Sequence, residues 1–224
     1  MNVLILDSES SGLPDWTAPS DAPQQPHMLQ IAALRISLGS IAFPQRAETP
    51  FNAWIKPEGW AVDEREVGDD GKPTAFSINR ISNAFLHEHG RPLAEVMDQF
   101  DAEFMAGAEE IYAYGAGFDR RILRIAALRR WGRDGHPRKG AAPPAWYCVL
   151  QTLTPLVALP PTDKMMNAGF KKFKPPTLAE AHTWAFGEGF DKAHDAAADL
   201  AATVRLFDHL RGKAVQFHRL RDRD

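Results

Sequence analysis

A run of four aliphatic residues near the start of the chain, Val3 to Leu6, is followed at once by the acids Asp7 and Glu9. A short, uninterrupted apolar run is typical of a strand that is buried on both faces of a sheet. Because strand side chains alternate between faces, Asp7 and Glu9 would share one face, with their Cα atoms roughly 7 Å apart. Carboxylates this close repel unless protons or a cation neutralise them, and their oxygens suit Mg²⁺ or Mn²⁺. The alternative is that the strand has ended and both acids are simply solvated.

The rest of the chain predicts an α/β fold in which a mixed sheet is flanked by helices. The region 146–158 is apolar but ambiguous between strand and helix. No linker divides the chain, so we expect one domain over 1–212 and a frayed tail over 213–224. Further strands are expected at 28–37, 51–56 and 110–114, helices at 92–104, 118–131, 177–186 and 194–211, and loops at 14–27, 57–77, 132–145 and 160–176.

Composition is that of an ordinary globular protein. The 224 residues are 44% hydrophobic and 25% charged, and the formal net charge is −3. This charge does not indicate nucleic-acid binding, which usually leaves a basic footprint, although acids that hold cations would contribute to it. The single cysteine, Cys148, excludes an intramolecular disulfide and favours a reducing, cytoplasmic setting. The sequence contains neither a signal-peptide pattern nor an apolar run of roughly 20 residues, so no membrane association is expected.

Two later groups of polar residues lie at expected helix starts. The small residues 115–117 follow a strand and open a helix that has Asp119 in its first turn. His194 and Asp199 lie near the start of the last long helix. Each acid has an ordinary explanation, because the helix dipole favours acids in a first turn. Histidine, however, can take up a proton near neutral pH, which is the property of a general base.

Taken in this order, the three groups resemble the motifs of the DEDDh exonuclease family, which includes polymerase proofreading subunits, ribonuclease T and oligoribonuclease. The family motifs are D-x-E followed by Ser or Thr and Gly, then Phe-Asp before an apolar helix, then H-x-A-x-x-D. The resemblance covers about residues 2–210. The matching residues are Asp7, Glu9, Ser10, Ser11 and Gly12 for the first motif, Phe118 and Asp119 for the second, and His194, Ala196 and Asp199 for the third.

The resemblance implies a ribonuclease H-like fold with a mixed five-stranded sheet, and a 3′–5′ exonuclease that releases nucleoside 5′-monophosphates. It implies two Mg²⁺ ions, for which Mn²⁺ substitutes, and a water that His194 deprotonates. Leu13 would wedge between the last two bases of the strand, unless it is simply buried. The implied metal ligands are Asp7, Glu9, Asp119 and Asp199, and the implied substrate-binding residues are Ser10, Gly12, Leu13 and Phe118.

Three further features are candidates for contact with nucleic acid. The segment 170–174 alternates phenylalanines with lysines, so it could stack bases and meet phosphates, or form a solvated loop. Arg120, Arg121 and Arg124 could touch the strand backbone, or belong to an exposed helix face. Trp16 could stack on a base or pack against the protein.

Single-stranded DNA 3′ ends are the favoured substrate, and RNA 3′ ends are the main alternative because the same active-site residues would serve both. A polymerase or a second copy of this chain is a candidate partner. A non-catalytic nucleic-acid-binding or polymerase-accessory module is disfavoured because all four acids and the histidine are present. A phosphatase with an aspartyl nucleophile is disfavoured because such enzymes usually have a second aspartate where Glu9 stands.

Overall fold

The computed structural model describes residues 1–38, 46–47, 49–189 and 194–221. Its centre is a mixed sheet in the order β3-β2-β1-β5-β6-β7, with β4 also paired to β2. The five longer strands account for the five that the resemblance implied, and two strands of two residues each extend the sheet. The strands are β1 (Asn2–Ser10), β2 (Met28–Ser37), β3 (Arg46–Ala47), β4 (Phe51–Trp54), β5 (Glu110–Ala113), β6 (Ala145–Cys148) and β7 (His218–Arg219).

The first strand, β1, is central and is paired unequally on its two sides. It runs antiparallel to β2 over its whole length, from Asn2 to Ser10. Its parallel pairing with β5 covers only Val3–Ile5. The last part of β1 therefore extends beyond β5, and its backbone groups on that side need other partners.

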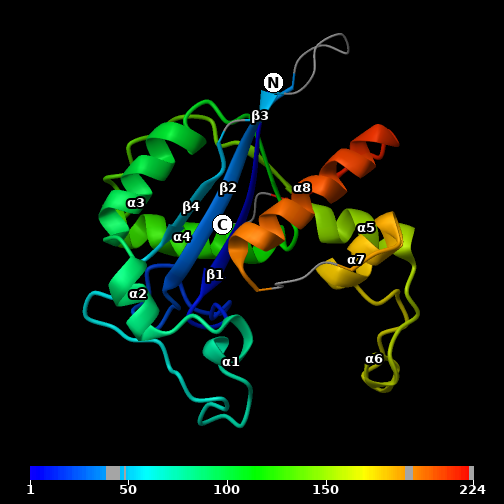
Figure 1. The fold of residues 1–224 in the computed structure, drawn as a ribbon, viewed down its shortest axis with the longest axis horizontal. Helices are drawn as coiled ribbons and strands as arrows, with labels where there is room; N and C mark the ends of the chain where they lie inside the picture. Colours follow the sequence, from blue (N-terminus) through cyan, green and yellow to red (C-terminus); the bar gives the residue numbers. More distant parts are fainter. Residues whose placement is uncertain (39–45, 48, 190–193, 222–224) are drawn as a thin grey trace.

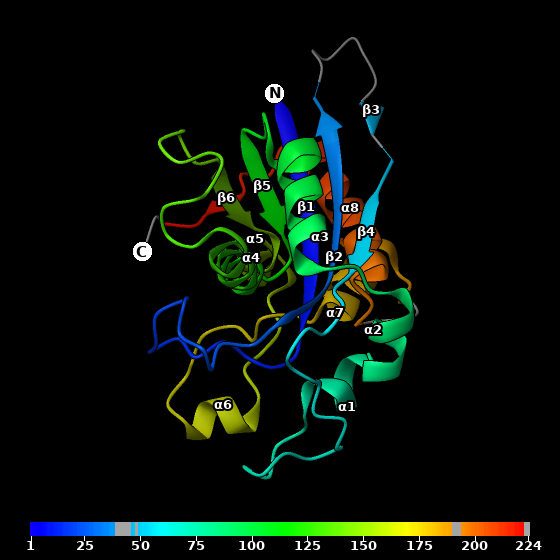
Figure 2. The same ribbon diagram turned by 90° about the vertical axis from the view of Figure 1, so that its left-hand side faces the viewer.

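Helices cover both faces of the sheet (Figures 1 and 2). On one face, α3 (Leu93–Phe100), its π-helical continuation η1 (Asp101–Met105) and α4 (Ala116–Trp131) pack against Leu4 and Leu6. On the other face, α8 (Ala196–Gly212) packs against Val3 and Ile5. The strand alternation that separates these side chains also sends Asp7 and Glu9 towards the face that α8 covers. Beside α8 lie α5 (Val149–Val157) and α7 (Leu178–Phe186), which share a smaller core with it.

The sequence did not predict three short helices: one begins in the expected loop 57–77, one follows it in a stretch without a prediction, and one lies in the expected loop 160–176. They are α1 (Ala75–Asn79), α2 (Asn83–His89) and α6 (Asp163–Asn167). Each helix is preceded by a residue whose hydroxyl accepts a backbone N–H of the first turn; these residues are Thr74, Ser82 and Thr162. Such N-caps supply one of the hydrogen-bond partners that a helix start lacks. Helices this short have no long apolar period, which is why the sequence pattern did not reveal them.

The predicted α/β architecture is confirmed, and the ambiguous region 146–158 contains both alternatives, the end of β6 followed by α5. The expectation of a frayed tail after residue 212 differs from the structure, where His218–Arg219 pairs with β6 and Phe217 packs against Tyr112. A two-residue strand is too short to show an alternating pattern, so the sequence could not indicate it. No helix within the described residues is both long and apolar enough to cross a membrane.

Candidate active site

Asp7 and Glu9 lie near the end of β1, opposite Ala32 and Gln30 of β2. Because β1 continues to Ser10, the alternative that the strand has already ended before these acids is wrong. Both carboxyl groups are partly buried. Burial and then the negative charges of Asp119 and Asp199 raise the pKa of Asp7 well above its ordinary value. Burial raises the pKa of Glu9 to about 8, against a hydrogen bond from Asn79 that lowers it.

Asp119 lies in the first turn of α4, beside the part of β1 that does not pair with β5. Its Oδ1 accepts hydrogen bonds from the backbone N–H of Ser8 at 3.0 Å and from the Ser8 hydroxyl at 2.8 Å. Asp119 is 3% exposed, and burial raises its pKa to about 7 despite the two bonds from Ser8. A carboxylate placed only to favour the helix dipole would face solvent, so the role of Asp119 extends beyond its own helix.

The N-terminus of α8 brings His194 and Asp199 towards the same region. The Asp195 side chain caps the helix by accepting the backbone N–H groups of Ala197 and Ala198. Asp199 therefore does not serve as the cap, and its Oδ2 accepts the backbone N–H of His194 at 3.2 Å. His194 is exposed and has a φ of 71°, which is uncommon for a residue with a side chain. This conformation turns the chain sharply just before the helix begins.

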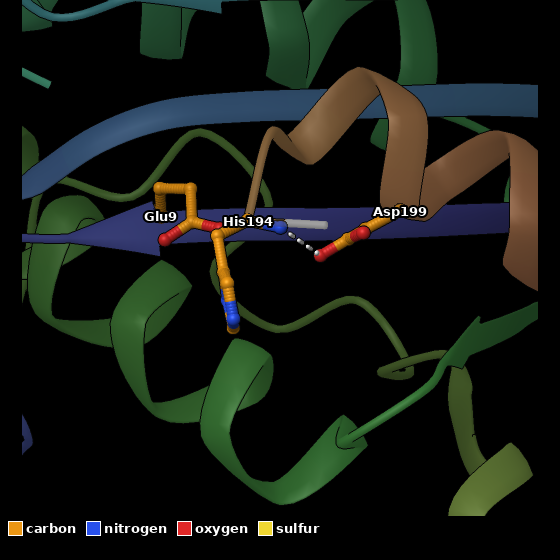
Figure 3. Close-up of side chains that lie close together, drawn as sticks. All are labelled: Glu9, His194 and Asp199. Carbon is orange, nitrogen blue, oxygen red and sulfur yellow. Dashed lines mark hydrogen bonds between the residues drawn. The ribbon is translucent and has the colours of Figure 1, made fainter. Parts of the chain in front are cut away.

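Glu9, His194 and Asp199 form a group that could hold a divalent cation. One potential ligand atom from each residue lies within 4.8 Å of the other two. The close-up shows Glu9 on its strand facing the start of α8, with Asp199 on that helix and His194 in the turn just before it (Figure 3). Asp199 Oδ1 is buried and has no hydrogen-bond partner among the described residues. Because buried carboxylate oxygens are almost always paired, this oxygen fits a site for a cation.

Two side chains that the sequence did not single out as site residues position the acids. Asn79, at the end of α1, donates from Nδ2 to Glu9 Oε2 at 3.3 Å. Gln30 is 1% exposed, and its Oε1 accepts the backbone N–H of Ala196 at 3.1 Å. The first contact fixes Glu9, and the second joins the N-terminus of α8 to β2. Gln30 could have been suspected as a polar residue in a buried strand, whereas Asn79 lies in an unrecognised short helix.

The residues implied to bind substrate follow directly after β1 or begin α4. Leu13 is 85% exposed, so the alternative that it is a buried core residue is wrong. The Ser10 hydroxyl donates to the carbonyl of Gly12 at 2.7 Å and closes the turn that leads to Leu13. Phe118 is partly buried and packs against the core on the α4 face. Only Leu13 therefore presents a large apolar side chain to solvent.

The arginines of α4 are placed differently from one another. Arg121 donates to the backbone carbonyls of Asp15 and Ala18, so it holds the loop that follows β1. Arg120 donates to the carbonyl of Arg221, and Arg124 is exposed. Trp16 is 61% exposed and has the Arg121 guanidinium 5.9 Å from its ring centroid. Arg124 thus belongs to an exposed helix face, as the alternative interpretation expected, whereas Arg121 holds the loop after β1 through its hydrogen bonds.

Comparison with solved structures shows that the fold of the chain is similar to that of exonuclease I. No family model matches the sequence, and no curated protein matches it. Escherichia coli exonuclease I in complex with a dT13 oligonucleotide superposes with a TM-score of 0.64 at 21% identity, covering 94% of this chain and 41% of that one. Exonuclease I from Methylocaldum szegediense gives a TM-score of 0.62 at 22% identity, with 95% and 40% covered. A zinc-bound complex of the E. coli enzyme with single-stranded DNA gives 0.62 at 20% identity, with 95% and 40% covered.

The chain therefore spans about two fifths of the exonuclease I chains that it matches. The likeness shows a shared fold, and the expected ribonuclease H-like mixed α/β architecture is confirmed.

Proposed function

We propose that the chain is a metal-dependent 3′–5′ exonuclease that removes nucleoside 5′-monophosphates from single-stranded nucleic acid, with DNA favoured. The observation that carries the proposal is the convergence of Glu9, His194 and Asp199, with one buried oxygen of Asp199 unpartnered among the described residues. These groups come from both ends of the sequence and meet at one end of the sheet. The domain that performs the reaction comprises residues 1–212 together with His218–Arg219, which pair with its sheet.

Four acids would form the metal site in this proposal: Asp7, Glu9 and Asp199 would hold one Mg²⁺, and Asp7 would also serve a second, with Asp119 acting through a water molecule. Mn²⁺ would substitute, since both are small cations that take oxygen ligands. Divalent ions at such a site stabilise negative charge on the attacking and leaving oxygens of a phosphodiester. Burial is the main cause of the raised pKa values of Asp7, Glu9 and Asp119, and the neighbouring negative charges add to it. A bound cation would offset both effects by stabilising the ionised carboxylates, which supports a cation site here.

His194 is the proton acceptor for the attacking water. An imidazole is suited to this step because its ordinary pKa lies near neutral pH. The backbone N–H of His194 is bonded to Asp199, so the position of the histidine is tied to that of a metal-binding acid. His194 is exposed, so a solvent water can approach its side chain without displacement of any part of the core.

The terminal nucleotide lies against the turn that follows β1. Backbone groups of Ser10–Gly12 contact it, Phe118 borders it, and Leu13 inserts between the last two bases. The 85% exposure of Leu13 supports this role, because it gains apolar contact only when a ligand is present. Solved exonuclease I complexes contain dT13, dA16 and 5cy-dA13 oligonucleotides, which favours DNA for this chain as well.

The test uses matched DNA and RNA 12-mers, labelled at the 3′ or the 5′ end, with Mg²⁺, Mn²⁺ or chelator. The expected result is release of labelled mononucleotide from the 3′ label and a shortening ladder from the 5′ label, only with metal and faster on DNA. If only the RNA 12-mer is shortened, DNA is not the substrate and the exoribonuclease alternative is correct. Strands that are retained but never shortened would contradict catalysis and indicate a binding module.

A further inference from the structure

Residues 160–173 form an arm between α5 and α7 that has a fixed base. The backbone N–H of Lys174 donates to the carbonyl of Leu159 at 2.9 Å, which brings the two ends of the arm together. The Lys174 ammonium pairs with Glu180, part of the capping box of α7. The Tyr114 hydroxyl donates to the carbonyl of Pro176 at 2.8 Å. The arm therefore projects from a base held by both α7 and the end of β5.

Large apolar side chains on this arm face solvent. Met166 is 50% exposed, Phe170 is 65% exposed and Phe173 is 47% exposed. None of the three belongs to a hydrophobic core cluster of the described residues. Three such side chains within eight positions leave an apolar surface that packs against nothing within the described chain, which is a mark of an interaction site.

The arm is also basic. Lys164, Lys171 and Lys172 are exposed, and Asp163 is the single acid between residues 160 and 173. Within the described part of the chain, Lys171 and Lys172 form no ion pair. Alternating aromatic and cationic side chains match a single-stranded nucleic acid, whose unpaired bases stack on rings while its phosphates attract lysines. A purely apolar protein partner would not need the lysines.

The base of the arm adjoins the candidate active site. Tyr114, which holds that base, directly precedes Gly115, the first residue of the turn into α4 and Asp119. Both ribbon views show α6 and α1 projecting from the end of the molecule where β1 finishes (Figures 1 and 2). Since Asn79 of α1 contacts Glu9, the site lies at the same end as both projections.

We propose that the arm is a stacking platform for unpaired bases of the strand upstream of the terminal nucleotide, with Phe170 and Phe173 as the stacking side chains. Lys171 and Lys172 contact the accompanying phosphates. This inference rests on the proposed exonuclease function, because it assigns the arm to the substrate of that site. Bases paired in a duplex are not free to stack on the arm, so it selects single strands.

The test measures binding of a 5′-fluorescent DNA 12-mer by anisotropy, in chelator so that no hydrolysis occurs. The double variant Phe170→Ala/Phe173→Ala should bind at least roughly thirtyfold more weakly than the wild-type chain, because two stacking contacts are lost. Trp184→Ala is the matched control, since Trp184 is another exposed aromatic, 39% exposed, that contacts Lys213 beyond the far end of α8. Its affinity should equal that of the wild type.

Three further comparisons separate stacking from other causes. A 12-mer with abasic sites at all positions except the last two should bind the wild type and the double alanine variant equally. Phe170→Leu/Phe173→Leu should bind as weakly as the alanine variant, because leucine is apolar but offers no ring. Lys171→Ala/Lys172→Ala should reduce the slope of log affinity against log salt by roughly 0.7 for each phosphate that a lysine no longer neutralises.

Equal binding of the intact 12-mer by wild type and double alanine variant, with circular dichroism showing both folded, would overturn the platform. So would full affinity in the leucine variant. Hydrolysis of a dinucleotide with Mg²⁺ reports the active site alone, because a dinucleotide has no bases beyond the last two for the arm to stack. If the wild-type chain binds the 12-mer through the arm but does not hydrolyse the dinucleotide, the exonuclease proposal is contradicted. The arm would then remain a binding surface for single strands.

Discussion

The first half of β1, Val3–Leu6, and the second half, Asp7–Ser10, belong to one strand but have opposite energetic roles. Val3, Leu4 and Ile5 are 0% exposed and pair with strands on both sides. The second half pairs with β2 alone, and Asp119 takes the place of a strand partner at Ser8. The first half is stabilised by burial of apolar side chains, whereas the second half buries carboxylates whose charge opposes burial.

This difference indicates where the molecule is stable and where it can react. The fully packed half fixes the position of the strand against α3, α4 and α8. The acidic half gains no comparable stabilisation, since the raised pKa values of Asp7 and Glu9 mean that ionisation opposes folding. A cation that binds these carboxylates in the folded chain and not in the unfolded chain would stabilise the fold. Substitutions in the two halves should therefore separate stability from activity.

The largest expected effect is on activity, in the acidic half. Asp7→Asn should lower kcat for oligonucleotide hydrolysis by about 10³-fold or more, because it removes a charge that the metal site needs. Asp195→Asn is the matched control, since asparagine also caps helices and Asp195 has no proposed ligand role. It should stay within a few-fold of the wild type. Steady-state kinetics on a labelled 12-mer measure both variants, and an active Asp7→Asn enzyme would contradict the site.

The next effect is on stability, in the packed half. Leu4→Ala should lower the free energy of unfolding by about 2–5 kcal/mol, because Leu4 is fully buried in the core beneath α3 and α4. Leu13→Ala, at an 85% exposed leucine, should change stability by less than about 0.5 kcal/mol. Urea denaturation measures both. The kinetics should show the reverse order, with folded Leu4→Ala near wild-type activity and Leu13→Ala impaired.

A smaller effect is the pH dependence of stability in the metal-free chain. The pKa of Glu9 in the folded chain is raised to about 8 from an ordinary 4.5, so its protonated form favours the folded state. That contribution is fully present below about pH 4.5 and is lost as the pH rises towards 8. Glu9→Gln should therefore become progressively more stable than the wild type between these limits. Denaturation in chelator across this range would refute the assignment if the difference stayed constant.

The smallest expected effect concerns Asn79, which holds Glu9 from α1. Asn79→Ala should lower kcat about tenfold while leaving the melting temperature nearly unchanged, since a hydrogen bond to a charged group contributes about 1.5–3 kcal/mol. The larger limit is not expected because the bond is long, 3.3 Å. Unchanged kcat would show that Asn79 does not position Glu9 during the reaction.

The sequence predicted the parts of the fold and site that depend on local pattern. The run Val3–Leu6 and the spacing of Asp7 and Glu9 follow strand alternation, and the structure places both acids as expected. The convergence of Asp119 and His194 with them could not come from spacing, since Asp119 contacts a residue 111 positions away. Their inclusion depended on the order of motifs and the family resemblance.

Other features could not be predicted from the sequence, because they are tertiary contacts made by short elements. Asn79 contacts Glu9 from a five-residue helix, and β7 has two residues. Gln30 stands in a buried strand, and only the structure shows that it is paired with Asn52 and Ala196. The arm could be suspected from its phenylalanines and lysines, but whether the rings are buried or exposed is decided by packing.

The central claim is that four acids, Asp7, Glu9, Asp119 and Asp199, bind divalent cations. Titration with Mn²⁺, followed by electron paramagnetic resonance, tests this claim most directly. At pH 7.5 the wild-type chain should bind about two Mn²⁺ ions, as expected for a two-metal nuclease site. Asp199→Asn, which neutralises the carboxylate with the unpartnered oxygen, should bind fewer ions and more weakly. A wild-type chain that binds no Mn²⁺, or an Asp199→Asn variant that binds it equally well, would contradict the account.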